Sequence, residues 1–144
     1  LDAPISATPS KVFFLRNAAN SKCLDSQEYG MPNGANVQLW QCNGEKWQQW
    51  YWTSDNQRGE IRNVSNDKCL DAQEYGGPNG ANVQLWECNG EKWQQWDWVA
   101  GKWYNEATGK CLDAQEYGLP NGANVQLWQC NGEGWQMWRA FYKK

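Results

Sequence analysis

The chain is dominated by one sequence unit that occurs three times. Its copies cover residues 22–50, 68–96 and 110–138. The first two copies differ at three positions, Ser26/Ala72, Met31/Gly77 and Gln41/Glu87. Even residues expected on the surface are identical at corresponding positions of these copies, which core packing alone does not require. Three equivalent surfaces favour multivalent binding over a single active site.

Length and charge narrow the class of protein. The chain has 144 residues and a net charge of −3, which fits one compact domain and provides no basic field for nucleic acid or anionic lipid. No apolar run approaches the roughly 20 residues of a membrane-spanning helix, so we expect no membrane insertion. The chain starts at Leu1, without an initiator methionine or an apolar signal region, and we expect a mature or trimmed product.

The six cysteines fall into one pair per repeat, 19 positions apart each time: Cys23 and Cys42, Cys69 and Cys88, Cys111 and Cys130. Six cysteines allow 15 connectivities, but a threefold arrangement needs the same partner choice in every unit, which favours three disulfides within repeats. A zinc site is less favoured because the chain has no histidine and no C-x-x-C motif. We therefore expect no metal, an oxidising compartment and a secreted, extracellular protein.

The pattern along the chain predicts an all-β fold. Residues 1–10 carry two prolines and no periodic apolar pattern, and we interpret them as a leader or linker stub. The rest, 11–144, forms a single domain of three repeats, about 11–58, 59–100 and 101–144. Each repeat is expected to supply four strands: a first strand (12–16, 60–63 or 102–105), then Lys-Cys-Leu-Asp, Asn-Val-Gln-Leu-Trp-x-Cys and Trp-Gln-x-Trp. About twelve short strands suit a closed barrel with pseudo-threefold symmetry.

Strand alternation predicts which side chains form the core. Successive residues of a strand point to opposite faces. Val37 and Leu39 then share one face, and Leu24 points to the same side from the neighbouring strand. These aliphatic side chains are expected to lie in the barrel interior, together with their counterparts in the other two repeats.

The opposite face carries polar and aromatic groups. Alternation places Gln38 and Trp40 outside, and Cys23 with Asp25 outside on the adjacent strand. A carboxylate, an amide and an indole plate would then share one solvent-facing surface. Such a set suits a sugar, because the ring's C–H face packs on an aromatic plate while its hydroxyls bond to carboxylates and amides.

Three Q-x-W motifs follow these strands at fixed spacing: Gln48-Gln-Trp50, Gln94-Gln-Trp96 and Gln136-Met-Trp138. Each stands after Cys-Leu-Asp and Val-Gln-Leu-Trp. In this respect the chain resembles the ricin B-chain-type β-trefoil lectins over about residues 11–142. The resemblance implies a β-trefoil with one shallow sugar pocket per repeat. It also implies that the Q-x-W tryptophans pack in the core.

The resemblance further implies roles for individual residues. The aspartate after Cys-Leu would bind sugar hydroxyls, and the tryptophan of Val-Gln-Leu-Trp would stack on the ring. These positions are Asp25, Asp71 and Asp113 for the carboxylates and Trp40, Trp86 and Trp128 for the rings. Strand alternation adds Gln38, Gln84 and Gln126 as candidate ligands, because they share the outer face of the tryptophan's strand.

One position departs from galactose-binding members of the family. They have Asn or Asp just before the Gln of Q-x-W, whereas this chain has Trp47, Trp93 and Trp135. Actinohivin-type lectins, which bind mannose, carry an aromatic residue there and an upstream Asn-Gly, as this chain does at Asn43, Asn89 and Asn131. We include all six residues as candidate sugar ligands. The sugar is expected to be of the galactose, N-acetylgalactosamine or mannose type, with xylan-like polysaccharides as a third possibility.

Other classes of function are less favoured. Without histidine, and without a serine or cysteine nucleophile motif, we expect no enzyme and no cofactor. The domain could be free-standing or a non-catalytic carbohydrate-binding module of a larger glycoside hydrolase or toxin. A second alternative is a protein-binding trefoil such as a protease inhibitor. The expected partners are mono- or oligosaccharides on glycoproteins, cell surfaces or polysaccharides.

Overall fold

A computed structural model describes residues 12–27, 32–54, 58–73, 77–115 and 120–143. The expected leader at residues 1–10 lies outside the described residues. In the described part, strands of two to six residues and three 3-10 turns of three residues are joined by loops. The strands are β1 (Phe13–Asn17), β2 (Cys23–Ser26), β3 (Ala35–Trp40), β4 (Trp50–Trp52), β5 (Arg58–Gly59), β6 (Ile61–Asn63), β7 (Cys69–Ala72), β8 (Val83–Trp86), β9 (Trp96–Val99), β10 (Lys102–Asn105), β11 (Cys111–Ala114), β12 (Ala123–Trp128) and β13 (Trp138–Tyr142).

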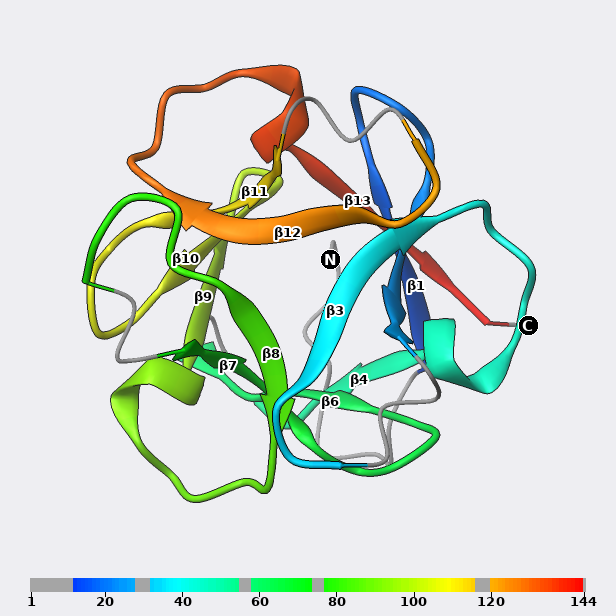
Figure 1. Cartoon of the computed structure of the whole chain (residues 1–144), viewed down its shortest axis with the longest axis horizontal. Coiled ribbons are helices and arrows are strands. Elements are labelled where there is room, and N and C mark those ends of the chain that lie inside the picture. The colour runs from blue at the N-terminus through cyan, green and yellow to red at the C-terminus, as the bar shows by residue number, and fades with distance from the viewer. Residues whose placement is uncertain (1–11, 28–31, 55–57, 74–76, 116–119, 144) are drawn as a thin grey trace.

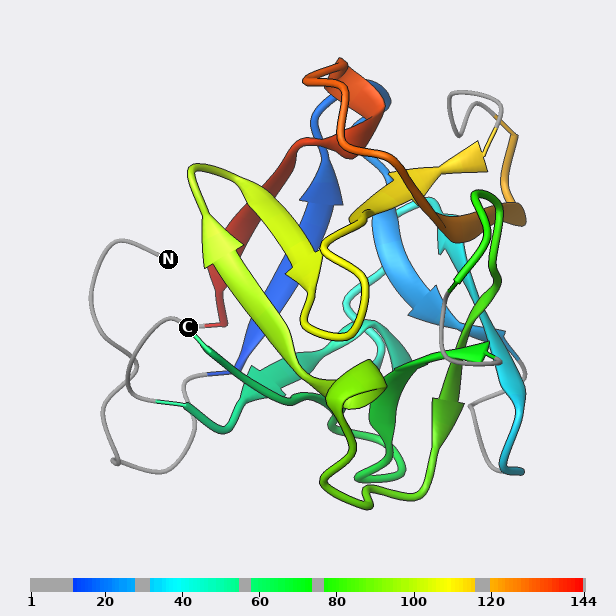
Figure 2. The same cartoon turned by 90° about the vertical axis from the view of Figure 1, so that its left-hand side faces the viewer.

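The strands close into a barrel with pseudo-threefold symmetry. Adjacent pairs are antiparallel, and the central pairing runs from β8 through β3 to β12. Figure 1 shows these three strands forming a triangle at the centre of the molecule, one strand from each repeat. The first and last strands, β1 and β13, also pair, which joins the ends of the domain (Figure 2). This arrangement is the β-trefoil that the resemblance implies.

The barrel interior is filled as the strand alternation predicts. Val37, Leu39 and Leu24 are each 0% exposed. The Q-x-W tryptophans are also buried, and the indole N–H of Trp50 donates to the carbonyl oxygen of Leu24 at 3.0 Å. A buried indole needs such a partner, and the same bond recurs in the other repeats. The predicted core role of these tryptophans is confirmed.

The three repeats are also joined at the symmetry axis by a ring of asparagines. Asn36 donates from Nδ2 to Oδ1 of Asn124 at 2.8 Å, Asn124 donates to Asn82 at 2.7 Å, and Asn82 donates to Asn36 at 2.8 Å. Every amide in the ring is both donor and acceptor. Because a one-residue slip of any central strand would break the ring, it fixes the register of β3, β8 and β12 against one another.

The predicted fourth strand is only partly correct. Instead of a continuous Trp-Gln-x-Trp strand, a 3-10 turn, η2, covers Lys46–Gln48 and β4 starts at Trp50. Backbone bonds from Gln48 to Glu45 at 2.9 Å and from Gln49 to Lys46 at 3.0 Å form the turn. The turn places the Gln48 side chain in the interior, which an extended strand would not do. The equivalent turns are η4 (Lys92–Gln94) and η6 (Gly134–Gln136).

Within the described ranges, no helix has the length and apolar character needed to span a bilayer. The three predicted disulfides are present as Cys23–Cys42, Cys69–Cys88 and Cys111–Cys130. Each bridge fastens the start of one strand to the loop after the next strand, and therefore holds two candidate site strands together.

Candidate functional site

The carboxylate of Asp25 joins two segments of the first repeat. Asp25 and Gln38 are cross-strand partners on β2 and β3. Gln38 donates from Nε2 to Oδ1 of Asp25 at 3.0 Å, and Gln48 donates from Nε2 to Oδ2 at 2.9 Å. Both oxygens of the carboxylate therefore accept a bond from a glutamine amide. The predicted proximity of Asp25 and Gln38 is confirmed.

Gln48 is the residue that closes this network. Its Nε2 also donates to the carbonyl oxygen of Gln41 at 3.0 Å, and its Oε1 accepts the backbone N–H of Asn43 at 2.9 Å. Since Gln48 is 0% exposed, all its polar atoms depend on these partners. Gln48 was not among the predicted site residues. Its identity in all three copies of Q-x-W was the available signal.

The same bonds recur in the second and third repeats at nearly the same lengths. Gln84 and Gln94 donate to Asp71 at 3.0 and 2.8 Å, and Gln126 and Gln136 donate to Asp113 at 3.0 and 2.8 Å. We call the three sets site 1 (Asp25, Gln38, Trp40), site 2 (Asp71, Gln84, Trp86) and site 3 (Asp113, Gln126, Trp128).

The predicted exposure of Asp25 is wrong. Asp25 is 3% exposed, as are Asp71 and Asp113, and Cys23 is 1% exposed. Their side chains do point away from the aliphatic core, but a 3-10 turn packs against the strand that carries each aspartate: η2 against β2, η4 against β7 and η6 against β11. Burial raises the pKa of the Asp25 carboxyl above its ordinary value of 3.8, and the bonds from Gln38 and Gln48 offset part of the rise. The carboxylate thus forms the floor of the site rather than its surface.

The tryptophan of each site is its exposed part. Trp40, Trp86 and Trp128 are 39%, 40% and 40% exposed, whereas the three Q-x-W tryptophans are at most 2% exposed. The predicted outward direction is confirmed. An indole left this open on a rigid strand keeps a large apolar face in water, which is a common feature of binding surfaces.

The candidate ligands Trp47, Trp93 and Trp135 lie where neighbouring repeats meet. Trp47 is half-buried, and its carbonyl oxygen accepts a bond from the buried Asn63 of the next repeat at 3.1 Å. This bond ties neighbouring repeats together, and it recurs from Asn105 to Trp93 and from Asn17 to Trp135. The half-buried rings of Trp93 and Trp135 also pack on the core.

Asn43 is exposed and stands at the edge of the same network. Its Oδ1 accepts the backbone N–H of Glu45 at 3.0 Å, which stabilises the turn before η2. Its own N–H is bound to Gln48, so the asparagine is placed by the group that also holds Asp25. Asn89 and Asn131 make the same two contacts.

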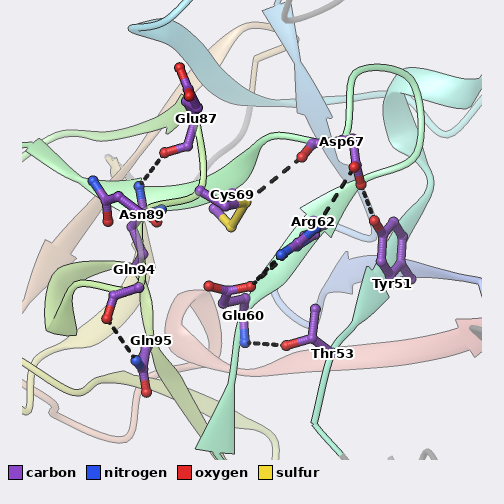
Figure 3. A network of polar contacts seen from close by, with 12 residues as sticks. Tyr51, Thr53, Glu60, Arg62, Asp67, Cys69, Glu87, Asn89, Gln94 and Gln95 are labelled. Carbon is purple, nitrogen blue, oxygen red and sulfur yellow. Dashed lines mark hydrogen bonds and ion pairs between the residues drawn. A yellow bond between two sulfur atoms is a disulfide. The ribbon is translucent and has the colours of Figure 1, made fainter. Parts of the chain in front are cut away.

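Polar contacts outside the shared pattern join the second repeat to Tyr51 of the first repeat. Arg62 pairs with Glu60 at 2.9 Å and with Asp67 at 3.7 Å, and Tyr51 donates to Asp67 (Figure 3). Ligand atoms of Glu60 and the Cys69–Cys88 pair lie within 4.8 Å of one another, but both sulfurs are joined in the disulfide and supply no thiolate for a metal. These surface contacts stabilise the repeat only slightly.

Comparison with known proteins identifies the family. The model of the ricin-type beta-trefoil lectin domain matches residues 11–141. The chain belongs to this family. None of the curated proteins matches it in sequence. The family and its lectin members support carbohydrate binding by this ricin-type domain.

Solved structures share the fold of this ricin-type domain. It is similar to the designed threefold symmetric protein ThreeFoil, with 28% identity, a TM-score of 0.84 and coverage of 90% of this chain and 97% of that one. The C-half of the earthworm R-type lectin, solved with GalNAc, has 18% identity and a TM-score of 0.79 over 92% of this chain and 99% of that one. An exo-β-1,3-galactanase from Clostridium thermocellum has 24% identity and a TM-score of 0.87, over 98% of this chain but only 31% of the enzyme.

Proposed function

We propose that the chain is a non-catalytic, multivalent lectin domain with one shallow sugar site in each repeat. The observation that carries this proposal is the recurrence of one arrangement three times: a half-open tryptophan beside an amide that a buried carboxylate holds in place. In each site the indole stacks on the sugar ring, and the amide and carboxylate take its hydroxyls.

The buried aspartate has a definite task in this proposal. An ionised carboxylate only accepts hydrogen bonds, so it forces Gln38 to turn its Nε2 inward. The Oε1 of Gln38 is then the atom presented to a ligand as an acceptor. Asp25 thereby sets the polarity of site 1, in addition to any bond of its remaining lone pairs to a hydroxyl.

Individual sites of this kind bind weakly. A single stacking ring and a few hydrogen bonds that replace bonds to water give dissociation constants of about millimolar to micromolar. Three sites on one rigid domain strengthen attachment to a surface that carries many sugars. The proposed partners are therefore glycoproteins, cell surfaces or polysaccharides. The three disulfides support the proposal that the protein is secreted, because disulfides persist in oxidising compartments.

A second candidate function is that of a targeting module within a larger enzyme. The match to the galactanase supports it, because nearly all of this chain corresponds to less than a third of that enzyme. The sugar sites would then hold a catalytic domain against its polysaccharide. The chemistry of the sites is the same in both cases.

A glycan array tests the proposal directly. From the family resemblance we expect binding to terminal galactose, N-acetylgalactosamine or mannose, with competition by the free sugar at about millimolar concentration. A folded, disulfide-intact protein that bound no glycan on the array would contradict the proposal. In that event a protein partner would become the better explanation for three equal surfaces.

Replacing all three site aspartates by asparagine is expected to preserve the fold and change recognition. Gln48 is fixed by its two other bonds, so it still donates toward residue 25 in Asp25→Asn. The new asparagine must therefore turn its side-chain oxygen to Gln48 and its nitrogen to Gln38. Gln38 then turns over and presents Nε2 to the ligand instead of Oε1. We expect loss of binding to the wild-type sugar with an unchanged near-ultraviolet circular dichroism spectrum. Unchanged sugar affinity would show that the orientation of Gln38 has no part in recognition.

A further inference from the structure

The Pro-Asn-Gly segment of each repeat lies against the site of the next repeat. Gly122, from the third repeat, donates its N–H to the carbonyl oxygen of Leu39 at 2.8 Å. Asn121 accepts the backbone N–H of Gln41 on its Oδ1, also at 2.8 Å. Leu39 and Gln41 stand directly before and after Trp40 in the chain, so these two bonds hold the third repeat beside site 1.

The arrangement is cyclic, so that each repeat reaches the site of the next one. Beside site 2, the N–H of Gly34 donates to the carbonyl oxygen of Leu85, and Oδ1 of Asn33 accepts the N–H of Glu87, both at 2.8 Å. Beside site 3, the N–H of Gly80 donates to the carbonyl oxygen of Leu127, and Oδ1 of Asn79 accepts the N–H of Gln129, also at 2.8 Å. The sequence alone gives only a turn here. Contact between one repeat's turn and another repeat's tryptophan depends on the closure of the barrel.

The glycine borders the groups proposed to touch sugar. A Cβ at Gly122 would lie 3.8 Å from Cζ3 of Trp40 and 3.9 Å from Oε1 of Gln38. Gly122 itself is exposed, with a φ of +90° that favours glycine. The missing side chain therefore leaves open the edge of the indole and the acceptor atom of the amide.

The asparagine adds a polar group at the same edge. Asn121 is exposed, and its Oδ1 is occupied by the bond from Gln41. Its Nδ2 makes no hydrogen bond to the described residues, and an amide nitrogen has two N–H groups that can donate to a ligand. The bond to Gln41 orients this amide next to the stacking ring.

We propose that every sugar site is shared by two repeats, with the neighbouring Asn-Gly supplying one wall and a hydrogen-bond donor. Asn121 and Gly122 complete site 1, Asn33 and Gly34 complete site 2, and Asn79 and Gly80 complete site 3. This inference rests on the proposed function. It means that an isolated repeat has no complete site, and that a change in one repeat alters binding in the next.

The test uses a protein in which only site 1 retains its tryptophan, made by Trp86→Ala and Trp128→Ala. N-acetylgalactosamine and methyl mannoside are titrated separately, and the tighter ligand is used. Gly122→Ala is expected to weaken binding about tenfold, because a methyl group would cover the indole edge and the amide oxygen. Gly132→Ala is the matched control, since Gly132 lies in the same repeat with a φ of +76° and nothing within 4 Å of its Cβ position.

Asn121→Asp provides a second variant that keeps the bond to Gln41. Its oxygen still accepts the Gln41 N–H, but the donor at Nδ2 is lost, and we expect weaker binding with no change in the thermal unfolding midpoint. If Gly122→Ala and Asn121→Asp both bind within about twofold of the Gly132→Ala control, each site belongs to one repeat and the inference is overturned. If the wild-type protein binds no glycan on the array, the proposed function fails, and this inference fails with it.

Discussion

Simultaneous replacement of Trp40, Trp86 and Trp128 by alanine is expected to abolish binding to a glycan-coated surface. Each ring is about two-fifths exposed, and in the proposed function it supplies the stacking face of its site. The variant should remain folded because the core tryptophans are untouched. Single replacements remove one site each, and retention on the surface should fall about tenfold or more per lost site as avidity is lost.

Surface plasmon resonance on an immobilised glycoprotein would measure this series. Phe141→Ala is the matched control, since Phe141 is an aromatic side chain with 43% exposure that lies outside the three sites. A triple variant that is retained as well as the Phe141→Ala control would show that these rings take no part in binding. Loss of all binding after a single replacement would instead show that only one of the three sites binds sugar.

The second large effect is expected at Gln48. Gln48→Ala removes two donated bonds and one accepted bond from a fully buried position, and leaves Oδ2 of Asp25 with one partner fewer. At about 1 kcal/mol for each bond, the free energy of unfolding should fall by about 3 kcal/mol. Urea denaturation with the disulfides intact measures this difference.

The neighbouring Gln49 offers a control for this experiment. It is 4% exposed, and among the described residues its side chain makes one hydrogen bond, to the carbonyl oxygen of Gly44 at 3.0 Å. We expect Gln49→Ala to cost about 1 kcal/mol. Equal losses for the two variants would mean that the network around Asp25 contributes nothing beyond an ordinary buried amide.

Local patterns in the sequence predict much of this fold. Alternation in β3 correctly placed Val37 and Leu39 inside and Trp40 outside, because a period of two is a property of any strand. The disulfides followed from symmetry, since one pairing had to serve three equal repeats. These features depend on residues near one another in the chain or on the repeat itself.

The sequence was less informative where distant segments meet. Alternation could show that Asp25 points away from the core, but not that the η2 turn would pack against its strand. The sequence pattern predicts a strand where the η2 turn lies, and a strand would not place the Gln48 side chain in the interior. The sequence also could not predict that Gly122 lies beside Trp40, because the two residues are brought together only when β3 pairs with β12.

The most direct test of three equivalent sugar sites is a nuclear magnetic resonance titration that follows the indole N–H signals. Signals are assigned with single Trp→Phe variants, and the sugar selected by the glycan array is added. Trp40, Trp86 and Trp128 should shift over one concentration range, while the buried Trp50, Trp96 and Trp138 stay constant. Shifts at only one exposed tryptophan, or at none of them while sugar binds, would contradict the account.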